Sequence, residues 1–150
     1  MNGPLVSFDD YNAVLSTAAF SPDPWLRRPT VLVIEDHSAL NLLLGIRLRH
    51  RGFEVRSAFD GVEGIQRAVR EEPDLILLDL GLPKLSGRDV LRALREHPGP
   101  FDTPVLVITG DRDARATREA SSWESVRKVF YKPTPATQIV STIESILNPH

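Results

Sequence analysis

The stretch Leu-Ile-Leu-Leu-Asp-Leu-Gly-Leu-Pro, residues 75–83, carries an aliphatic run into an acidic residue, Asp79, and then into glycine and proline. A nearly continuous aliphatic run of this length is typical of a strand that is buried on both faces, as in a parallel sheet. Glycine and proline directly after it indicate a turn. The stretch therefore predicts a central parallel strand, Leu75–Asp79, that presents a carboxylate at its carboxyl end.

Similar apolar runs recur along the chain and alternate with amphipathic stretches. The other strand candidates are Thr30–Glu35, Glu54–Ala58, Val105–Thr109 and Val129–Tyr131. Alternation of this kind is typical of βα units stacked in one parallel sheet. We expect an α/β fold with three central and two flanking strands.

Helix start signals precede most of the amphipathic stretches. Expected helices run from Ser38 to His50, from Asp60 (with Glu63) to Pro73, from Ser86 (with Asp89) to near Pro98, and from a Thr134 N-cap with Pro135 at the first helical position. A serine, threonine or aspartate before the first turn is the usual N-cap, and proline is favoured at the first helical position. Residues 111–128 hold few apolar side chains and predict only a short or irregular helix.

The first of these helices has more apolar side chains than one core stripe needs. Leu40, Leu43, Leu44 and Leu48 are expected in the core, which leaves Leu42 and Ile46 on another face. A rotated register of the same helix is the alternative.

Residues 1–29 read differently from the rest. The segment Ser21–Trp25 has the composition of a linker, and Ser7 with Asp10 form a capping-box pattern for a short helix. The sequence leaves two readings open for 1–29: a linker or leader, or an extension with a short helix.

Composition excludes several classes of protein. The chain has 150 residues, a net charge of −2 and no cysteine. This length suits one main domain, and the absence of cysteine excludes disulfides and thiolate metal sites and is compatible with a cytoplasmic location. No strong basic bias points to nucleic acid, and no apolar stretch approaches the roughly 18 residues that span a bilayer. We expect neither partner.

The acidic residues gather where predicted strands end. Glu35 and Asp36 follow the first strand, and Asp79 ends the third. Because ligands bind at the carboxyl edge of such sheets, we expect one pocket of three carboxylates, which suits Mg²⁺. Thr109 and Lys132 arrive at the same edge and complete a phosphate site in which Asp79 is the nucleophile.

Each of these residues alone has a plainer explanation. A strand-terminal aspartate is often an N-cap, a lysine before proline is usually a solvated loop charge, and threonine favours strands. A phosphohydrolase that uses an aspartate nucleophile is the rival enzyme class, but it needs a second aspartate where this chain has Gly81. No nucleotide-binding glycine loop is present.

Four motifs together resemble the receiver domain of bacterial two-component response regulators. They are Val-Leu-Val-Ile-Glu-Asp from Val31, Leu-Leu-Asp-Leu-Gly-Leu-Pro from Leu77, Val-Ile-Thr-Gly from Val107 and Tyr-Lys-Pro from Tyr131. The resemblance implies a flavodoxin-like, doubly wound five-stranded parallel sheet of order 2-1-3-4-5. It assigns residues 30–150 to the receiver domain.

The resemblance also implies the role of each site residue. Asp79 would be the phosphoacceptor; Asp36 and Asp79 would bind Mg²⁺ directly, Glu35 through water, and Gly81 through its carbonyl. Thr109 and Lys132 would contact the phosphoryl group. A sensor histidine kinase or a histidine phosphotransfer protein would be the donor, and Leu42 and Ile46 would belong to its docking surface.

On this reading the chain is a stand-alone, chemotaxis-regulator-like receiver. It catalyses only its own phosphorylation and slow dephosphorylation, with Gly81 and Asp111 flanking the path of the hydrolytic water. Its output goes through contacts with a downstream protein, and a homodimer is left open.

Two departures from the family pattern concern that output. Val129 stands where these proteins usually carry a switch tyrosine or phenylalanine, and Ser125-Val126 replaces the usual Gly-Ala pair. We hypothesise that Phe130, Tyr131 or Trp123 substitutes for the missing aromatic. The alternative is a receiver-like interaction module that works without phosphorylation.

Overall fold

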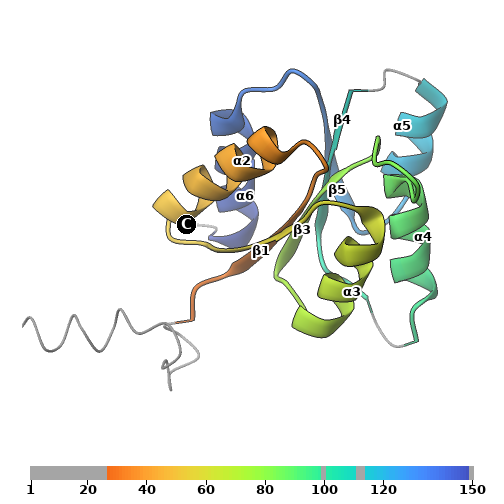
Figure 1. Ribbon diagram of the computed structural model, residues 1–150, viewed down its shortest axis with the longest axis horizontal. Coiled ribbons are helices and arrows are strands. Elements are labelled where there is room, and N and C mark those ends of the chain that lie inside the picture. Colours follow the sequence, from red (N-terminus) through yellow and green to blue (C-terminus); the bar gives the residue numbers. More distant parts are fainter. Residues whose placement is uncertain (1–26, 99–100, 111–113, 149–150) are drawn as a thin grey trace, which may run out of the picture.

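Five parallel strands form one sheet with helices on both faces (Figure 1). The computed structural model describes residues 27–98, 101–110 and 114–148. The elements are β1 (Thr30–Ile34), α2 (Ser38–His50), β2 (Glu54–Ala58), α3 (Gly61–Glu71), β3 (Leu75–Asp79), α4 (Gly87–Glu96), β4 (Val105–Thr109), α5 (Ala114–Ser121), β5 (Val126–Tyr131) and α6 (Ala136–Leu147). The order β2-β1-β3-β4-β5 confirms the predicted fold.

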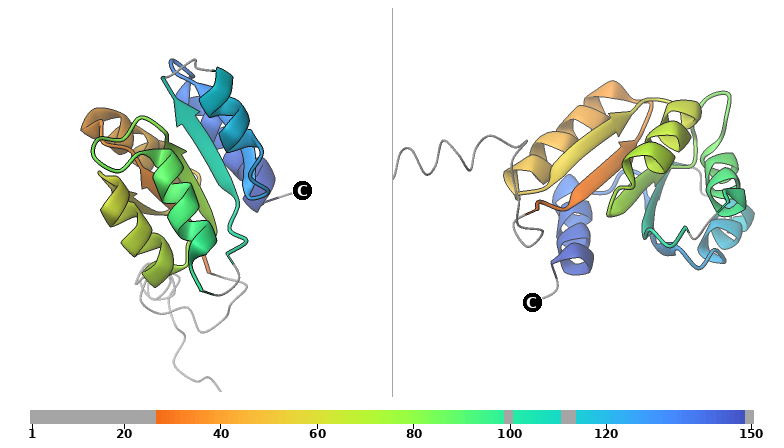
Figure 2. Two further views of the ribbon diagram at one scale, coloured as in Figure 1. Left: turned by 90° about the vertical axis from the view of Figure 1, so that its right-hand side faces the viewer. Right: turned by 90° about the horizontal axis from the view of Figure 1, so that it is seen from below.

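Helices lie on both sides of the sheet (Figure 2). The sheet separates two apolar cores. One core packs beneath α2 and α6, and the other beneath α3, α4 and α5. Every residue of β1, β3 and β4 is buried, and successive side chains alternate between the two cores. This double burial explains why these three strands are aliphatic except at strand ends, where Thr30, Asp79 and Thr109 lie. No helix in the described part of the chain is both long and apolar enough to cross a membrane.

Two of the four predicted helix starts are confirmed. Asp60 accepts from the Glu63 amide, and Ser86 with Asp89 form a reciprocal capping box. The other two starts need correction. His37, rather than Ser38, caps α2, because its Nδ1 accepts from the Leu40 amide.

The predicted Thr134 cap of the last helix is wrong. The Thr134 hydroxyl donates to the Tyr131 carbonyl instead, and α6 begins at Ala136. Pro135 is the N-cap and makes no side-chain capping bond. Its ψ of 133° places it outside the helix.

The core stripe of α2 also differs from the expectation. Leu43 is 42% exposed, whereas Asn41 and Gly45 are buried beside Leu44. The helix is rotated so that a polar side chain and a glycine face the sheet. Leu42 and Ile46 are exposed, as predicted.

The ends of the outer elements were harder to predict. β5 begins at Val126, three residues before the predicted start, and contains an irregularity: Val105 pairs with Val126, but the next residue, Leu106, pairs with Lys128. Its polar residues Arg127 and Lys128 are exposed, as an edge strand allows. β1 ends at Ile34, although the Glu35 amide still bonds to the Ala58 carbonyl.

The short helix expected between residues 111 and 128 is α5. The suggested helix near Ser7 and the position of Asp111 lie outside the described residues.

At the β2 edge of the sheet, Arg56 of β2 pairs with Glu54 at 2.6 Å and with Glu71 of α3 at 3.7 Å.

Candidate functional site

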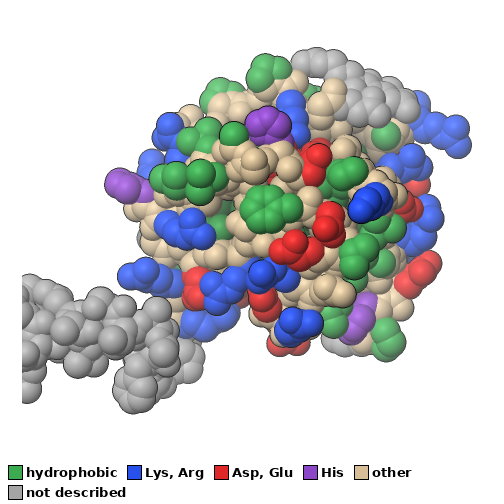
Figure 3. Space-filling model, viewed as in Figure 1, with side chains coloured by type: hydrophobic (Ala, Val, Ile, Leu, Met, Phe, Trp, Pro, Cys, Tyr) green, Lys and Arg blue, Asp and Glu red, His purple; other side chains and the backbone are tan. Residues whose placement is uncertain are grey.

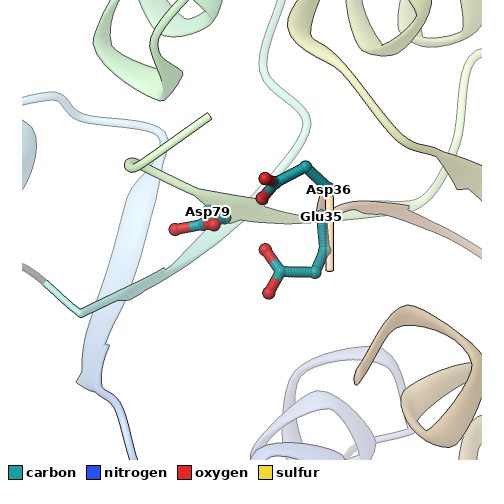
Figure 4. Close-up of side chains that lie close together, drawn as sticks. All are labelled: Glu35, Asp36 and Asp79. Atoms are coloured by element: carbon teal, nitrogen blue, oxygen red, sulfur yellow. The ribbon is translucent and has the colours of Figure 1, made fainter. Parts of the chain in front are cut away.

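Three carboxylates meet at the carboxyl ends of β1 and β3 (Figure 4). One oxygen from each of Glu35, Asp36 and Asp79 lies within 4.8 Å of the others. Glu35 and Asp79 are buried, whereas Asp36 is exposed. Two adjacent central strands position this cluster because their aliphatic runs end at the same level of the sheet.

Lys132 joins the cluster from the loop after β5. Its Nζ donates to Glu35 Oε1 at 2.7 Å and to Asp79 Oδ2 at 3.2 Å. The Lys132 amide donates to the Thr109 carbonyl at 2.8 Å, which fixes the lysine beside the end of β4. The ammonium therefore bridges carboxylates from two strands.

Thr109 and Gly81 complete the set of predicted site residues. Thr109 is the last residue of β4 and is buried. The Gly81 amide donates to Asp79 Oδ1 at 2.9 Å, so both oxygens of Asp79 have a protein partner. All six predicted residues lie on the loops and strand ends of this one edge.

Burial and the hydrogen bond between the two buried acids divide one proton unequally between them. Burial, followed by the hydrogen bond with Asp79, raises the pKa of Glu35 to about 8. Burial alone would raise the pKa of Asp79, but hydrogen bonds with Glu35 and the Gly81 amide, together with Lys132, lower it. Glu35 thus carries the proton near neutral pH and Asp79 stays ionised.

The pKa of Lys132 changes with its partners. Burial lowers the pKa of the ammonium, but the hydrogen bond to Glu35 and the charge of Asp79 outweigh that effect and raise it. The lysine is therefore a fixed positive charge. A fixed cation beside an ionised carboxylate is the arrangement that an incoming anion requires.

The donor set fits a hard divalent cation. Every candidate ligand is oxygen, as Mg²⁺ prefers. Glu35 Oε2 is buried and has no hydrogen-bond partner among the described residues. A buried carboxylate oxygen without a partner is costly, and a metal ion or its water would satisfy it.

Sequence reasoning missed two residues that hold the site together. Asn41 of α2 donates from Nδ2 to the carbonyls of Glu35 and Ala58. Gly87, the first residue of α4, approaches the main chain of Asp79 so closely that a Cβ would lie 2.3 Å from its carbonyl oxygen. In the sequence Asn41 lies among apolar residues, and no local pattern marks it as a core position.

Comparisons with known proteins agree with this geometry. Transcriptional regulatory protein PrrA of Mycobacterium tuberculosis is 34% identical over 125 residues, which are 83% of this chain and 52% of PrrA. The DNA-binding dual master transcriptional regulator RpaA of Synechocystis is 43% identical over 81 residues, covering 54% of this chain and 34% of RpaA. The chain spans about half or less of the length of these curated relatives.

A solved structure shows the same fold. Chemotaxis response regulator CheY4 of Vibrio cholerae superimposes with a TM-score of 0.72 at 23% identity, over 80% of this chain and 99% of that one. The family description that matches residues 31–144 is the response regulator receiver domain. With its fold, its acidic cluster and its sequence in agreement, the chain belongs to the receiver domain family of response regulators.

Proposed function

We propose that Asp79 accepts a phosphoryl group from a phosphohistidine, in a reaction that requires Mg²⁺. One observation carries the proposal: Lys132 Nζ bridges Glu35 and Asp79 inside a cluster of three carboxylates. An ionised carboxylate next to a fixed cation is a suitable nucleophile for phosphorus, because the cation reduces repulsion from the phosphoryl oxygens.

In the proposed step a carboxylate oxygen of Asp79 forms a bond to phosphorus as the bond from phosphorus to the donor imidazole breaks. The electron pair of that bond returns to the imidazole nitrogen, which takes up a proton. Lys132 neutralises a phosphoryl oxygen, and the Thr109 hydroxyl donates a hydrogen bond to another. When bound, Mg²⁺ supplies the positive charge that offsets repulsion between the two anions.

For the metal we propose direct ligation by Asp36 and Asp79, the Gly81 carbonyl as a further ligand, and Glu35 through water. The position of Lys132 supports the indirect role of Glu35, since its Oε1 already accepts from the ammonium. The protein is then not a turnover enzyme. It catalyses its own phosphorylation and a slow hydrolysis.

A sensor histidine kinase or a histidine phosphotransfer protein is the proposed donor, acting in the cytoplasm as part of a phosphorelay. Leu42 and Ile46 of α2 are 61% and 53% exposed, which supports a docking surface on this helix. Apolar side chains this exposed on neighbouring turns are typical of interaction sites.

The proposed output is a contact with a downstream protein rather than with nucleic acid. Phe130 is buried with α2 and α6, on the opposite face of β5 from Val129. Tyr131 lies two residues beyond Val129 and shares its face. Of the two aromatic residues of β5, Tyr131 is therefore the better placed to move when Thr109 contacts the phosphoryl group.

The deciding experiment is incubation with Mg²⁺ and acetyl phosphate, followed by intact mass and by size-exclusion chromatography. We expect one phosphoryl adduct on the parent chain and none on Asp79→Asn or in excess EDTA. Absence of an adduct on the folded parent chain would overturn the proposal and favour the phosphorylation-independent module. A change in elution volume on phosphorylation would identify a homodimer.

A further inference from the structure

A groove between α2 and α6 has an apolar floor. Its volume is about 310 Å³, and it is lined by Leu43, Ile46, Arg47, His50, Thr137 and Val140, with Arg51 at one end. This volume is at the lower end of the range for ligand sites, about 300–1,000 Å³. Leu43 and Ile46 are 42% and 53% exposed, so the groove borders a larger apolar surface that includes Leu42.

The rim of the groove is basic. Arg51 pairs with Glu144 at 3.0 Å, but Arg47 makes no salt bridge to any described residue. His50 completes the last turn of α2. In Figure 3, apolar and basic side chains intermingle on the side where α2 lies in Figure 1, and acidic side chains lie nearer the middle of that face. The groove therefore suits an occupant that is both apolar and acidic.

Residues 1–26 have that composition. They contain three aspartates, Asp9, Asp10 and Asp23, and no lysine, arginine or histidine. Their apolar residues include Leu5, Val6, Phe8, Val14 and Leu15. Within a chain that otherwise mixes both charges, this segment matches the groove in sign and in hydrophobicity.

The segment also joins the domain at a suitable place. The Glu54 amide donates to the Pro29 carbonyl, and the Phe53 amide to the Leu48 carbonyl, so the start of β1 lies beside the end of α2. An extended chain reaches about 3.3 Å per residue, and α2, which has 13 residues, is roughly 20 Å long. A linker of seven residues or so therefore reaches any part of the groove.

We infer that residues 1–26 dock intramolecularly into the α2–α6 groove, with apolar side chains against Leu43 and Ile46 and with Asp9 and Asp10 toward Arg47. Charge selects this surface over the other exposed apolar stripe, Phe59, Val62 and Val69 at α3. On α3 the acidic residues Glu63 and Glu71 pair with Arg67, whereas the lining of the α2–α6 groove includes Arg47, His50 and Arg51 and no acidic residue.

The test uses the full chain, and the absence of cysteine makes one engineered thiol unique. A nitroxide on Asn12→Cys would report proximity through broadening of amide resonances, with the reduced label as reference. We expect loss of intensity at Leu43, Ile46, Thr137 and Val140 and not at α3. Arg47→Glu should restore that intensity. Arg127→Glu is the matched control, because Arg127 is an exposed arginine on β5 that makes no salt bridge to a described residue, and it should leave the broadening unchanged.

Three outcomes with the singly labelled chain would overturn the inference. They are broadening nowhere on the described domain, broadening centred on α3, and broadening of the groove that Arg47→Glu leaves intact. A further sample mixes two kinds of chain: one carries the spin label but no ¹⁵N, and the other carries ¹⁵N but no spin label. This mixture shows whether the groove is occupied by a second copy of the chain. Groove broadening in that mixture would contradict docking within one chain.

Discussion

The side-chain amide of Asn41 bonds to the Glu35 carbonyl at 3.0 Å and ties the start of α2 to the end of β1. The same Nδ2 bonds to the Ala58 carbonyl at 3.1 Å. One buried amide thus holds together three elements immediately behind the acidic pair. Its Oδ1 has no partner among the described residues, so both of its bonds serve the main chain of the site.

Replacing Asn41 with leucine should loosen the acidic pair. Loss of the two bonds removes the Asn41 donor from the Glu35 carbonyl, while the Ala58 carbonyl keeps its bond from the Glu35 amide. We expect a cost of about 1–3 kcal/mol of unfolding free energy. Mg²⁺ affinity should fall about tenfold, as when other supports of metal ligands are removed. Urea denaturation and calorimetric Mg²⁺ titration measure the two effects, with Arg49→Gln on the exposed face of α2 as control. Unchanged Mg²⁺ affinity in a destabilised variant would reduce Asn41 to a structural role.

Lys132→Ala should separate metal binding from phosphoryl transfer. The variant loses the cation beside Asp79, so the rate of phosphorylation by acetyl phosphate should fall about 100-fold or more. Mg²⁺ affinity should stay the same or increase, because a competing positive charge has gone. Initial rates by mass spectrometry and Mg²⁺ titration test both parts. Parallel loss of both functions would contradict this division of roles.

Glu35→Gln should change the pH dependence of stability in metal-free buffer. The folded pKa of Glu35 is about 8, above an unfolded value near 4.3, so between these values the native state holds a proton that the unfolded state has lost. The stabilisation that comes from this proton is fully present at low pH and is lost as the pH rises through the folded pKa, near 8. The variant should therefore gain stability relative to the parent between pH 5 and pH 8, by on the order of 2 kcal/mol.

Urea midpoints at several pH values measure that difference, and taking it against the parent cancels the histidines common to both chains. The contribution of Asp79 to stability has the opposite pH dependence, because the folded pKa of Asp79 is lowered. Its stabilisation is present at pH values above the unfolded pKa and is lost only in acid. Mg²⁺ binding should release the Glu35 proton, so added Mg²⁺ should stabilise the parent more at pH 8 than at pH 6. A parent and a variant with parallel pH profiles would show that Glu35 is ionised throughout.

Gly87→Ala should disrupt the fold at the site, whereas Gly81→Ala should not. A Cβ on Gly87 would meet the Asp79 carbonyl at 2.3 Å and the Leu80 Cα at 2.6 Å, both of them backbone atoms. A Cβ on Gly81 has only Asp79 Oδ1 within 4 Å, at 3.6 Å. We expect Gly87→Ala to cost about 3 kcal/mol or more and Gly81→Ala less than about 1 kcal/mol, by thermal or urea unfolding. Equal stabilities would show that α4 shifts without penalty.

Much of this site was predictable from sequence because aliphatic runs locate strand ends. The runs that end at Glu35, Asp79 and Thr109 predicted which side chains meet, since parallel strands share one carboxyl edge. The supporting contacts were not predictable. Asn41 and Gly87 act through close approaches between separate elements, and no local pattern encodes these approaches.

Local patterns also misplaced some details. Apolar residues surround much of α2, so periodicity could not decide whether Leu43 or Asn41 faces the sheet. Thr134-Pro135 has the composition of a helix start, but a hydrogen bond to the Tyr131 carbonyl engages the hydroxyl. At β5 the polar pair Arg127-Lys128 does not match the apolar pattern of a buried strand, because this part of the strand is exposed at the sheet edge. The predicted start of β5 was therefore too late.

The ion pairs of Arg56 have a consequence for association between chains. β2 is one of the two edge strands, with β5 at the other edge, and an open edge can template another strand. Arg56, held by Glu54 and Glu71, places charge along that edge, and a strand added there would have to desolvate it. Growth of the sheet into a longer ribbon is thereby disfavoured at the β2 edge, and a second domain that approaches there meets charge instead of an open strand.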